Sequence, residues 1–229
     1  MLEGKKCLVI GSGISGIGAA VLLEKNHADV VLYDSSDKLT KEDLEAKLPG
    51  ESKAVCIAGE LPEEVELSIQ AAVLSPGVPT DIPLVNRMRD RGVQILGEIE
   101  LGFLAEQGRV IAITGTNGKT TTTTLTGEIM KAHFGAEKTF VVGNIGNPYT
   151  LEVTKTSKDS VTVGEISSFQ LETIHTFHPV VSAILNITPD HLNRHHTMEA
   201  YVAAKEAVAS QQTKADICVL NYDLSLIHI

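Results

Sequence analysis

Several features that mark other protein classes are missing from this sequence. It has no tryptophan, few aromatic residues, and three cysteines, Cys7, Cys56 and Cys218, without C-x-x-C spacing. No apolar stretch of about 18 residues predicts a membrane span, and the N-terminus lacks the apolar segment of a signal peptide. The net charge is −10 with no run of Lys or Arg, which argues against nucleic-acid binding. We therefore expect a cytoplasmic protein with three buried, reduced thiols that binds neither membrane nor nucleic acid.

What the sequence does contain is a regular alternation of short apolar runs and helical patterns. The 229 residues are 43% hydrophobic and 21% charged, as in ordinary α/β domains. Such alternation predicts parallel sheets with helices on both faces. The expected strands are 6–10, 30–33, 54–57, 71–74, 93–95, 110–114, 139–142, 160–165, 180–185 and 216–220. The expected helices are 16–25, 41–48, 62–70, 83–91, 98–106, 119–133 and 198–210.

Two α/β domains are expected. The helix "GEIELGFLAEQG" ends in a glycine, and "RVIAITG" then opens a second nucleotide-binding pattern. This predicts a Rossmann-like parallel-sheet domain at residues 1–105 and a P-loop NTPase-like α/β domain at 106–229. We expect the second domain to be incomplete, because no closing pattern follows "ADICVLNYD", and residues 224–229 to be foreign to the gene.

The first glycine-rich turn is "VIGSGISGIGAA". Gly11, Gly13 and Gly16 form GxGxxG between a predicted strand and a predicted helix, where backbone N–H groups attract anions. Asp34 follows the second strand at the spacing of a ribose-binding acid. The pattern alone leaves open a dinucleotide, another nucleotide, or a turn that serves only packing.

The second turn, "ITGTNGKTTTTTL", indicates ATP binding. Its GxxGKT pattern departs from the full Walker motif, since Ile113 stands at the first glycine position. Backbone N–H groups would surround the phosphates, Lys119 would supply a positive charge, and the Thr120 hydroxyl would bind Mg²⁺. We expect Thr122–Thr124 to pack or hydrogen-bond to the backbone. The candidate ATP-binding residues are Gly115, Thr116, Asn117, Gly118, Lys119, Thr120 and Thr121.

Further polar residues follow predicted strands or lie in a helix, and each has an alternative interpretation. Glu165 is placed to bind Mg²⁺ or to cap a helix. His191 follows another strand, as a ligand or as a solvated loop residue. Lys205 lies in the middle of a helix, where a lysine is usually exposed. We expect His195 and His196 to be loop residues.

The order of motifs makes the sequence resemble the Mur ligases. "GTNGKTT", "GNIG", "EISSFQLE", "NITPDHLNRH" and "YVAAK" carry the resemblance in the second half, and "GSGISG", "YDSS", "LSPGVP" and "ILGEIEL" in the first, from about residue 5 to 223. The first-half motifs are similar to those of the member that adds D-glutamate. Gly164 and Asn193 depart from the pattern, and we expect Gly164 to loosen its strand end. From the resemblance we expect the family's C-terminal, amino-acid-binding domain to be absent from this chain.

The resemblance implies a reaction and its residues. ATP would phosphorylate the carboxylate of UDP-N-acetylmuramoyl-L-alanine, and the amine of D-glutamate would attack the acyl phosphate, in peptidoglycan precursor synthesis. The implied catalytic residues are Lys119, Asn144, His191 and Lys205. The implied Mg²⁺ ligands are Thr120, Glu165, His191 and Lys205 as a carbamate. The implied sugar-nucleotide contacts are Ser12, Ile14, Ser15, Gly16, Asp34, Ser35, Ser75, Pro76, Gly77, Asn144, Ser167 and Gln170.

Other functions remain open at this stage. A sibling Mur ligase or a folylpolyglutamate synthase-like ligase would share the second-half motifs. An NAD-binding oxidoreductase or sensor module would use the first loop alone. We expect the enzyme to be a monomer, and we expect this chain by itself to be inactive because we expect it to lack the D-glutamate-binding domain.

Overall fold

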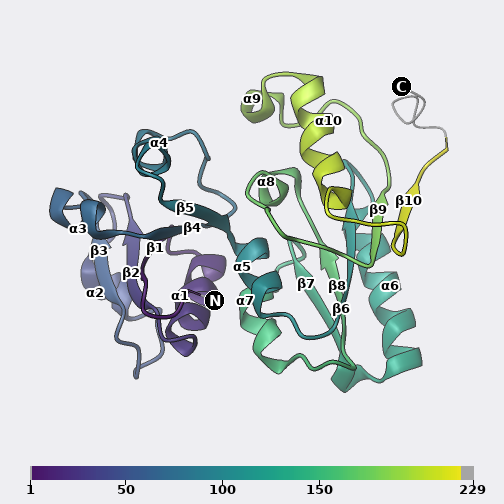
Figure 1. Cartoon of the computed structure of the whole chain (residues 1–229), viewed down its shortest axis with the longest axis horizontal. Coiled ribbons are helices and arrows are strands. Elements are labelled where there is room, and N and C mark those ends of the chain that lie inside the picture. The colour runs from purple at the N-terminus through teal and green to yellow at the C-terminus, as the bar shows by residue number, and fades with distance from the viewer. Residues whose placement is uncertain (1, 223–229) are drawn as a thin grey trace.

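The computed structural model describes residues 2–222, which form two five-stranded parallel sheets (Figure 1). The strand order is β3-β2-β1-β4-β5 in the first sheet and β10-β9-β6-β8-β7 in the second. In each sheet the first strand in sequence, β1 or β6, is central. Ligands of such doubly wound sheets bind beyond the carboxyl ends of the strands, where the order reverses. The expectation about residues 224–229 lies outside the described residues.

Each of the ten predicted strands forms. Most bounds differ from the prediction by a residue or two, because apolar runs specify the centre of a strand better than its ends. The strands are β1 (Lys6–Ile10), β2 (Asp29–Asp34), β3 (Val55–Ala58), β4 (Ala71–Leu74), β5 (Gln94–Gly97), β6 (Arg109–Thr114), β7 (Thr139–Gly143), β8 (Val161–Glu165), β9 (Val181–Ile184) and β10 (Ile217–Leu220). The ladder of β8 stays paired with β6 and β7 through Gly164, so the expected loosening there is wrong.

The predicted helices also form, some shorter than expected. They are α1 (Ile14–Lys25), α2 (Lys41–Glu45), α3 (Glu63–Ser68), α4 (Pro83–Asp90), α5 (Glu98–Ala105), α6 (Lys119–Phe134) and α10 (Met198–Glu206). Three one-turn helices were not predicted, α7 (Tyr149–Glu152), α8 (Ser168–Leu171) and α9 (Leu192–His195). None of the helices described is long and apolar enough to cross a membrane.

The first sheet is buried on both faces. Cys7, Val9 and Leu32 face one apolar cluster, and Leu8 and Ile10 face the other. Continuous apolar runs such as "KCLVI" place apolar side chains on both faces of the sheet. This explains why the parallel strands could be predicted from the sequence. The first cluster continues through Val110 and Ala112 of β6, so one core joins the two halves.

Close packing along α5 and α7 holds the halves together. A Cβ on Gly102 would lie 2.7 Å from the Tyr149 ring, so only glycine allows this approach. The buried carboxylate of Glu98 accepts hydrogen bonds from the backbone N–H and hydroxyl of Thr150, both 2.8 Å long. Glu106 accepts from the Tyr149 hydroxyl at 2.8 Å. These contacts fix the position of one set of strand ends relative to the other.

The expectation that all three cysteines are buried is wrong for Cys218. Cys7 and Cys56 are buried, whereas Cys218 is exposed on β10. An apolar run specifies a strand, but burial also needs elements packed over its faces. Within residues 2–222, β10 lies at the edge of its sheet with all four side chains exposed.

Candidate active site

The first glycine-rich turn lies between β1 and α1. Asp34 at the end of β2 accepts hydrogen bonds from the backbone N–H of Ser12 at 2.9 Å and from its hydroxyl at 2.7 Å. Burial by itself would raise the pKa of Asp34, but the hydrogen bonds from Ser12 and Ser36 outweigh it and leave the pKa below the usual value. A Cβ on Gly16 would lie 1.9 Å from the carbonyl oxygen of Gly11, so the third glycine permits the tight turn.

Two cavities open beside this turn. The larger, of about 480 Å³, is lined by first-half residues that include Tyr33, Ser35 and Leu84. The other, of about 450 Å³, lies between the halves. Nine of the predicted sugar-nucleotide residues line the second cavity: Ser12, Ile14, Ser15, Asp34, Ser75, Pro76, Gly77, Asn144 and Gln170. Of the remaining three, Ser35 lines the larger cavity, whereas Gly16 and Ser167 are in neither lining.

The hydroxyl of Ser167 has a local role. It caps α8 by accepting a hydrogen bond from the backbone N–H of Gln170. The side-chain oxygen of Gln170 in turn accepts a hydrogen bond from the backbone N–H of Ser167 at 2.9 Å. This reciprocal capping fixes the turn that follows β8.

Lys47 was missed by the sequence reasoning. Its Nζ lies 3.1 Å from the hydroxyl and 3.3 Å from the carbonyl oxygen of Ser12, which places a positive charge on the first loop. Lys47 lies beyond α2, in a stretch with several charged residues, and no motif distinguishes it from the other lysines.

The second loop connects β6 to α6. Gly118 precedes the helix with φ of 81°, a left-handed conformation that favours glycine. Lys119 folds back, and its Nζ donates to the carbonyl oxygens of Gly115 at 3.0 Å and Thr116 at 2.9 Å. The first N–H groups of any helix lack intrahelical partners, so α6 presents donors to an anion here. Of the later threonines, Thr123 is buried and Thr124 exposed, so packing explains only part of the run.

Residues far along the chain support this loop. The side-chain oxygen of Asn186 accepts from the backbone N–H groups of Thr116 at 3.1 Å and Asn117 at 2.8 Å. The hydroxyl of Tyr201 lies 3.1 Å from that of Thr116, which also contacts the backbone of Thr188. Sequence reasoning missed Asn186 and Tyr201 as loop supports, although Asn186 stands just beyond a predicted strand.

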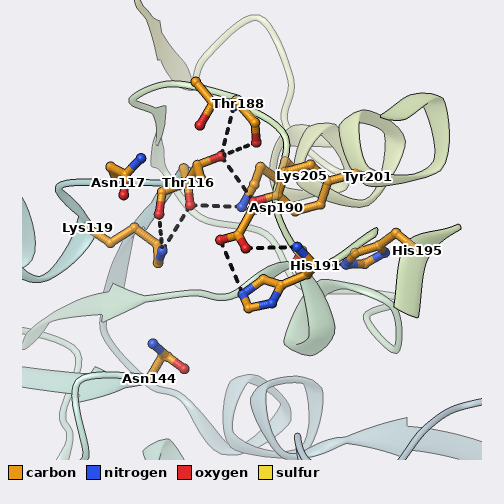
Figure 2. Close-up of polar contacts among 12 residues, drawn as sticks. Thr116, Asn117, Lys119, Asn144, Thr188, Asp190, His191, His195, Tyr201 and Lys205 are labelled. Atoms are coloured by element: carbon orange, nitrogen blue, oxygen red, sulfur yellow. Dashed lines mark hydrogen bonds and ion pairs between the residues drawn. The ribbon is translucent and has the colours of Figure 1, made fainter. Parts of the chain in front are cut away.

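Lys205 is not a surface lysine. It is 1% exposed and its Nζ donates to the carbonyl oxygen of Gly115 at 2.8 Å. Figure 2 shows Lys119 and Lys205 approaching the loop from different sides, with Asp190 near Lys205. Burial, followed by the positive charge of Lys119, lowers the pKa of Lys205 to about 8. A buried amine with this pKa is in part neutral at neutral pH, and the neutral form is the nucleophilic one.

Glu165 ends β8, beside β6. Its Oε1 accepts from the Asn144 amide at 2.7 Å, while its Oε2 is buried without a hydrogen-bond partner in the described structure. An unpaired buried carboxylate oxygen is costly, and a cation would compensate it. The residues therefore fit Mg²⁺, which binds proteins through one or two carboxylates and completes its coordination with waters and phosphate oxygens. No group of three or more His, Cys, Asp or Glu that could hold a metal ion occurs in residues 2–222.

Two histidines of the segment after β9, His191 and His195, differ in their burial. His191 is half-exposed, with its Nε2 3.5 Å from Asp190, and has a φ of 52°, which is uncommon outside glycine. His195 is not a loop residue as expected. It ends α9, is buried, and its Nε2 lies 2.9 Å from the Ser168 hydroxyl. Burial lowers the pKa of His195.

This arrangement agrees with the family comparisons. The sequence model of the Mur ligase middle domain matches residues 113–228, and that of the MurD-like N-terminal domain of Mur ligases matches residues 5–97. The chain belongs to the Mur ligase family. Among curated Mur ligases, the UDP-N-acetylmuramoylalanine–D-glutamate ligase of Lachnospira eligens is 58% identical over 222 residues, and that of Lachnoclostridium phytofermentans is 55% identical over 220. The alignments cover 97% and 96% of this chain but 49% and 48% of those ligases, so the chain spans about half their length.

Solved Mur ligase structures share the fold. UDP-N-acetylmuramate:L-alanyl-gamma-D-glutamyl-meso-diaminopimelate ligase from Neisseria meningitides superposes with a TM-score of 0.60 at 14% identity, covering 98% of this chain and 74% of that one. UDP-N-acetylmuramate-alanine ligase from Thermotoga maritima gives 0.56 at 21% identity, covering 97% and 50%. The division at residues 105 and 106 stays a prediction.

Proposed function

We propose that this chain supplies the sugar-nucleotide and ATP sites of a ligase that adds D-glutamate to UDP-N-acetylmuramoyl-L-alanine in the cytoplasm. The observation that carries the proposal is the 450 Å³ cavity between the halves. It is lined both by the first glycine-rich turn and by Asn144, which is bonded to the metal-compatible Glu165. A ligand held at the first turn would extend toward Asn144 and Glu165, at the end of β8, which lies beside the strand β6 that leads into the second loop.

The proposed reaction has two steps. A carboxylate oxygen of the L-alanine residue attacks the γ-phosphorus of ATP and ADP leaves. The amine of D-glutamate then attacks the acyl carbon and phosphate leaves. Two anions must approach in the first step, so cations and N–H dipoles near the phosphates provide the main catalytic effect. Lys119 and the N-terminus of α6 are placed to supply it, and bound Mg²⁺ would neutralise further phosphate charge.

The proposed metal ligands come from neighbouring elements. Glu165 would use its unpartnered oxygen, Thr120 its exposed hydroxyl at the start of α6, and His191 its ring. Lys205 would act as a carbamate, formed when its neutral amine adds CO₂ and releases a proton. The burial of Lys205 beside the second loop supports this role, because that site would give a carbamate the proximity to phosphate-bound metal that a surface lysine lacks.

On the sugar-nucleotide side, Lys47 would offset the diphosphate charge at the first turn. A chain with a net charge of −10 cannot attract an anion through its overall field, so a single cation next to Ser12 matters there. The larger cavity beside Tyr33 and Ser35 would hold the uridine.

Equilibrium titration tests the proposal. The chain is titrated with UDP-N-acetylmuramoyl-L-alanine and, separately, with NAD⁺. We expect binding of the sugar nucleotide, displaced by UDP, and no comparable binding of NAD⁺. Tight NAD⁺ binding without sugar-nucleotide binding would instead support an oxidoreductase or sensor module.

A further inference from the structure

Arg194 connects the first half of the molecule to the second. It belongs to α9 of the second half, yet its Nη1 donates to the carbonyl oxygen of Pro76 and its Nη2 to that of Val78, each at 3.3 Å. Both carbonyls belong to the turn after β4, which also lines the cavity between the halves and the larger cavity of the first half. The turn at one proposed ligand site is therefore held by a side chain from the other half.

The guanidinium of Arg194 is fixed from its own side as well. Its Nη2 donates to Oε2 of Glu172 at 2.9 Å, and its carbon lies 4.1 Å from the centre of the Phe169 ring. The side chains of Arg194 and Glu172 are 16% and 18% exposed, so solvent screens this ion pair only in part. A planar guanidinium can serve two carbonyls, a carboxylate and a ring face together, which an ammonium group cannot do.

The same arginine is close in sequence to the second site. His191, a proposed metal ligand, begins the turn that forms α9, and its carbonyl oxygen accepts from the backbone N–H of Arg194 at 2.9 Å. His195, the next residue, is anchored to Ser168 of α8. Arg194 is thus in direct backbone contact with the segment that carries His191 and Asp190.

From these contacts we infer that Arg194 is a positioning residue that couples binding at the first-half turn to binding of nucleotide phosphates at the second loop. The inference rests on the proposed function, which assigns ligands to both sites. A ligand that orders the 75–78 turn also orders Arg194 and the His191 segment. The second ligand then binds with a smaller loss of conformational entropy. Thermodynamic linkage makes the effect reciprocal.

The experiment measures linkage in the full 229-residue chain, not affinity alone. UDP is titrated by calorimetry without a second ligand and then with saturating ADP and Mg²⁺. We expect UDP to bind at least about fivefold more tightly in the second titration, at the lower end of ordinary allosteric coupling. In Arg194→Ala the ratio should fall to about one, and in Arg194→Lys to an intermediate value, because lysine retains charge without the planar fork.

Arg87→Ala is the matched control. Arg87 also pairs with a buried glutamate, Glu66, but both residues belong to the first half. It should keep the wild-type ratio, and melting curves verify that each variant is folded. The inference is overturned if the ratio of UDP affinities with and without ADP and Mg²⁺ is near one in the wild-type chain, or if it is unchanged in folded Arg194→Ala. In either case, binding of UDP and ADP still supports the proposed function. If the wild-type chain binds neither UDP nor ADP, the proposed function fails, and the inference that rests on it fails too.

Discussion

Asn144 is joined to Glu165 by two hydrogen bonds, one from its backbone N–H to the carbonyl oxygen at 2.8 Å and one from its amide to Oε1 at 2.7 Å. The pair ties the turn after β7 to the end of β8. Oε2 of Glu165 remains buried and without a hydrogen-bond partner within the described structure, which a cation would compensate. Asn144 thereby links the cavity that it lines to the proposed metal position.

Glu165→Gln should weaken the metal dependence of nucleotide binding. The amide keeps the shape of the side chain but loses the negative charge that attracts Mg²⁺. We expect the gain in ADP affinity on adding Mg²⁺ to fall by on the order of tenfold, as for other losses around a metal, with little change in EDTA. Calorimetric titrations with and without Mg²⁺ measure it. Glu128→Gln, on the exposed part of α6, is the control. An undiminished Mg²⁺ effect in Glu165→Gln would remove Glu165 from the ligand set.

Lys119→Ala should weaken ADP binding by at least about tenfold, the equivalent of 1.4 kcal/mol. The substitution removes the positive charge at the loop together with the hydrogen bonds of Nζ to the carbonyl oxygens of Gly115 and Thr116. Fluorescence titration with a labelled ADP measures the loss, and Lys131→Ala, on the same helix but paired with Glu128, serves for comparison. In a ligase that contains this loop, turnover should be abolished. Equal affinities for the two variants would show that the Lys119 charge does not contribute to ADP binding.

Lys205 should take up CO₂ in a pH-dependent way. The pKa is lowered to about 8 by burial, so the neutral amine increases as pH rises through that value. With ¹³C-bicarbonate we expect the carbamate signal in the NMR spectrum to be stronger at pH 8.5 than at pH 6.5, because the neutral amine of Lys205 is roughly 25-fold more abundant at the higher pH. Lys205→Ala should lack the signal and, in a ligase, lose activity that bicarbonate does not restore. A persistent signal in Lys205→Ala would place the carbamate on another lysine.

How far the sequence predicts this molecule depends on how local each feature is. β1 was predicted to the residue because a strand buried on both faces is a continuous apolar run. α8 and α9 were missed because a single turn shows no periodicity, and their ends depend on the Ser167 cap and the backbone of His191 and His196. Glycine-rich turns carry their own signature, so the loops of both sites were found.

Burial and long-range pairing were harder to predict. Lys205 reads as an ordinary helix lysine, and only the packing of α10 near the second loop shows that it is buried. The roles of Arg194 and Lys47 could not be predicted, because each forms hydrogen bonds with residues more than 30 positions away in the sequence. For Cys218 the error was the opposite one, because burial was predicted and the residue is exposed. Its apolar neighbours predicted a strand but did not predict that the strand lies at a sheet edge.

Lys47→Ala should weaken UDP binding several-fold, because the side chain places the cation at Ser12. Since Lys47 is exposed, the loss should be larger at low salt than at high salt. UDP titrations at two ionic strengths measure this, with Lys38→Ala for comparison. A loss independent of salt would indicate that Lys47 acts by shaping the loop instead of by its charge.

Two glycines of the first turn should differ in how strongly the same substitution affects stability. A Cβ at Gly16 would lie 1.9 Å from the backbone oxygen of Gly11, and backbone cannot yield without moving β1 or α1. A Cβ at Gly13 would meet no atom within 4 Å, and its φ of −72° suits any residue. Gly16→Ala should therefore lower the free energy of unfolding by about 1–3 kcal/mol, as overpacking does. Gly13→Ala should change it by no more than about 0.5 kcal/mol. Urea unfolding followed by circular dichroism measures both, and equal stabilities would mean that α1 does not approach the turn as closely as described.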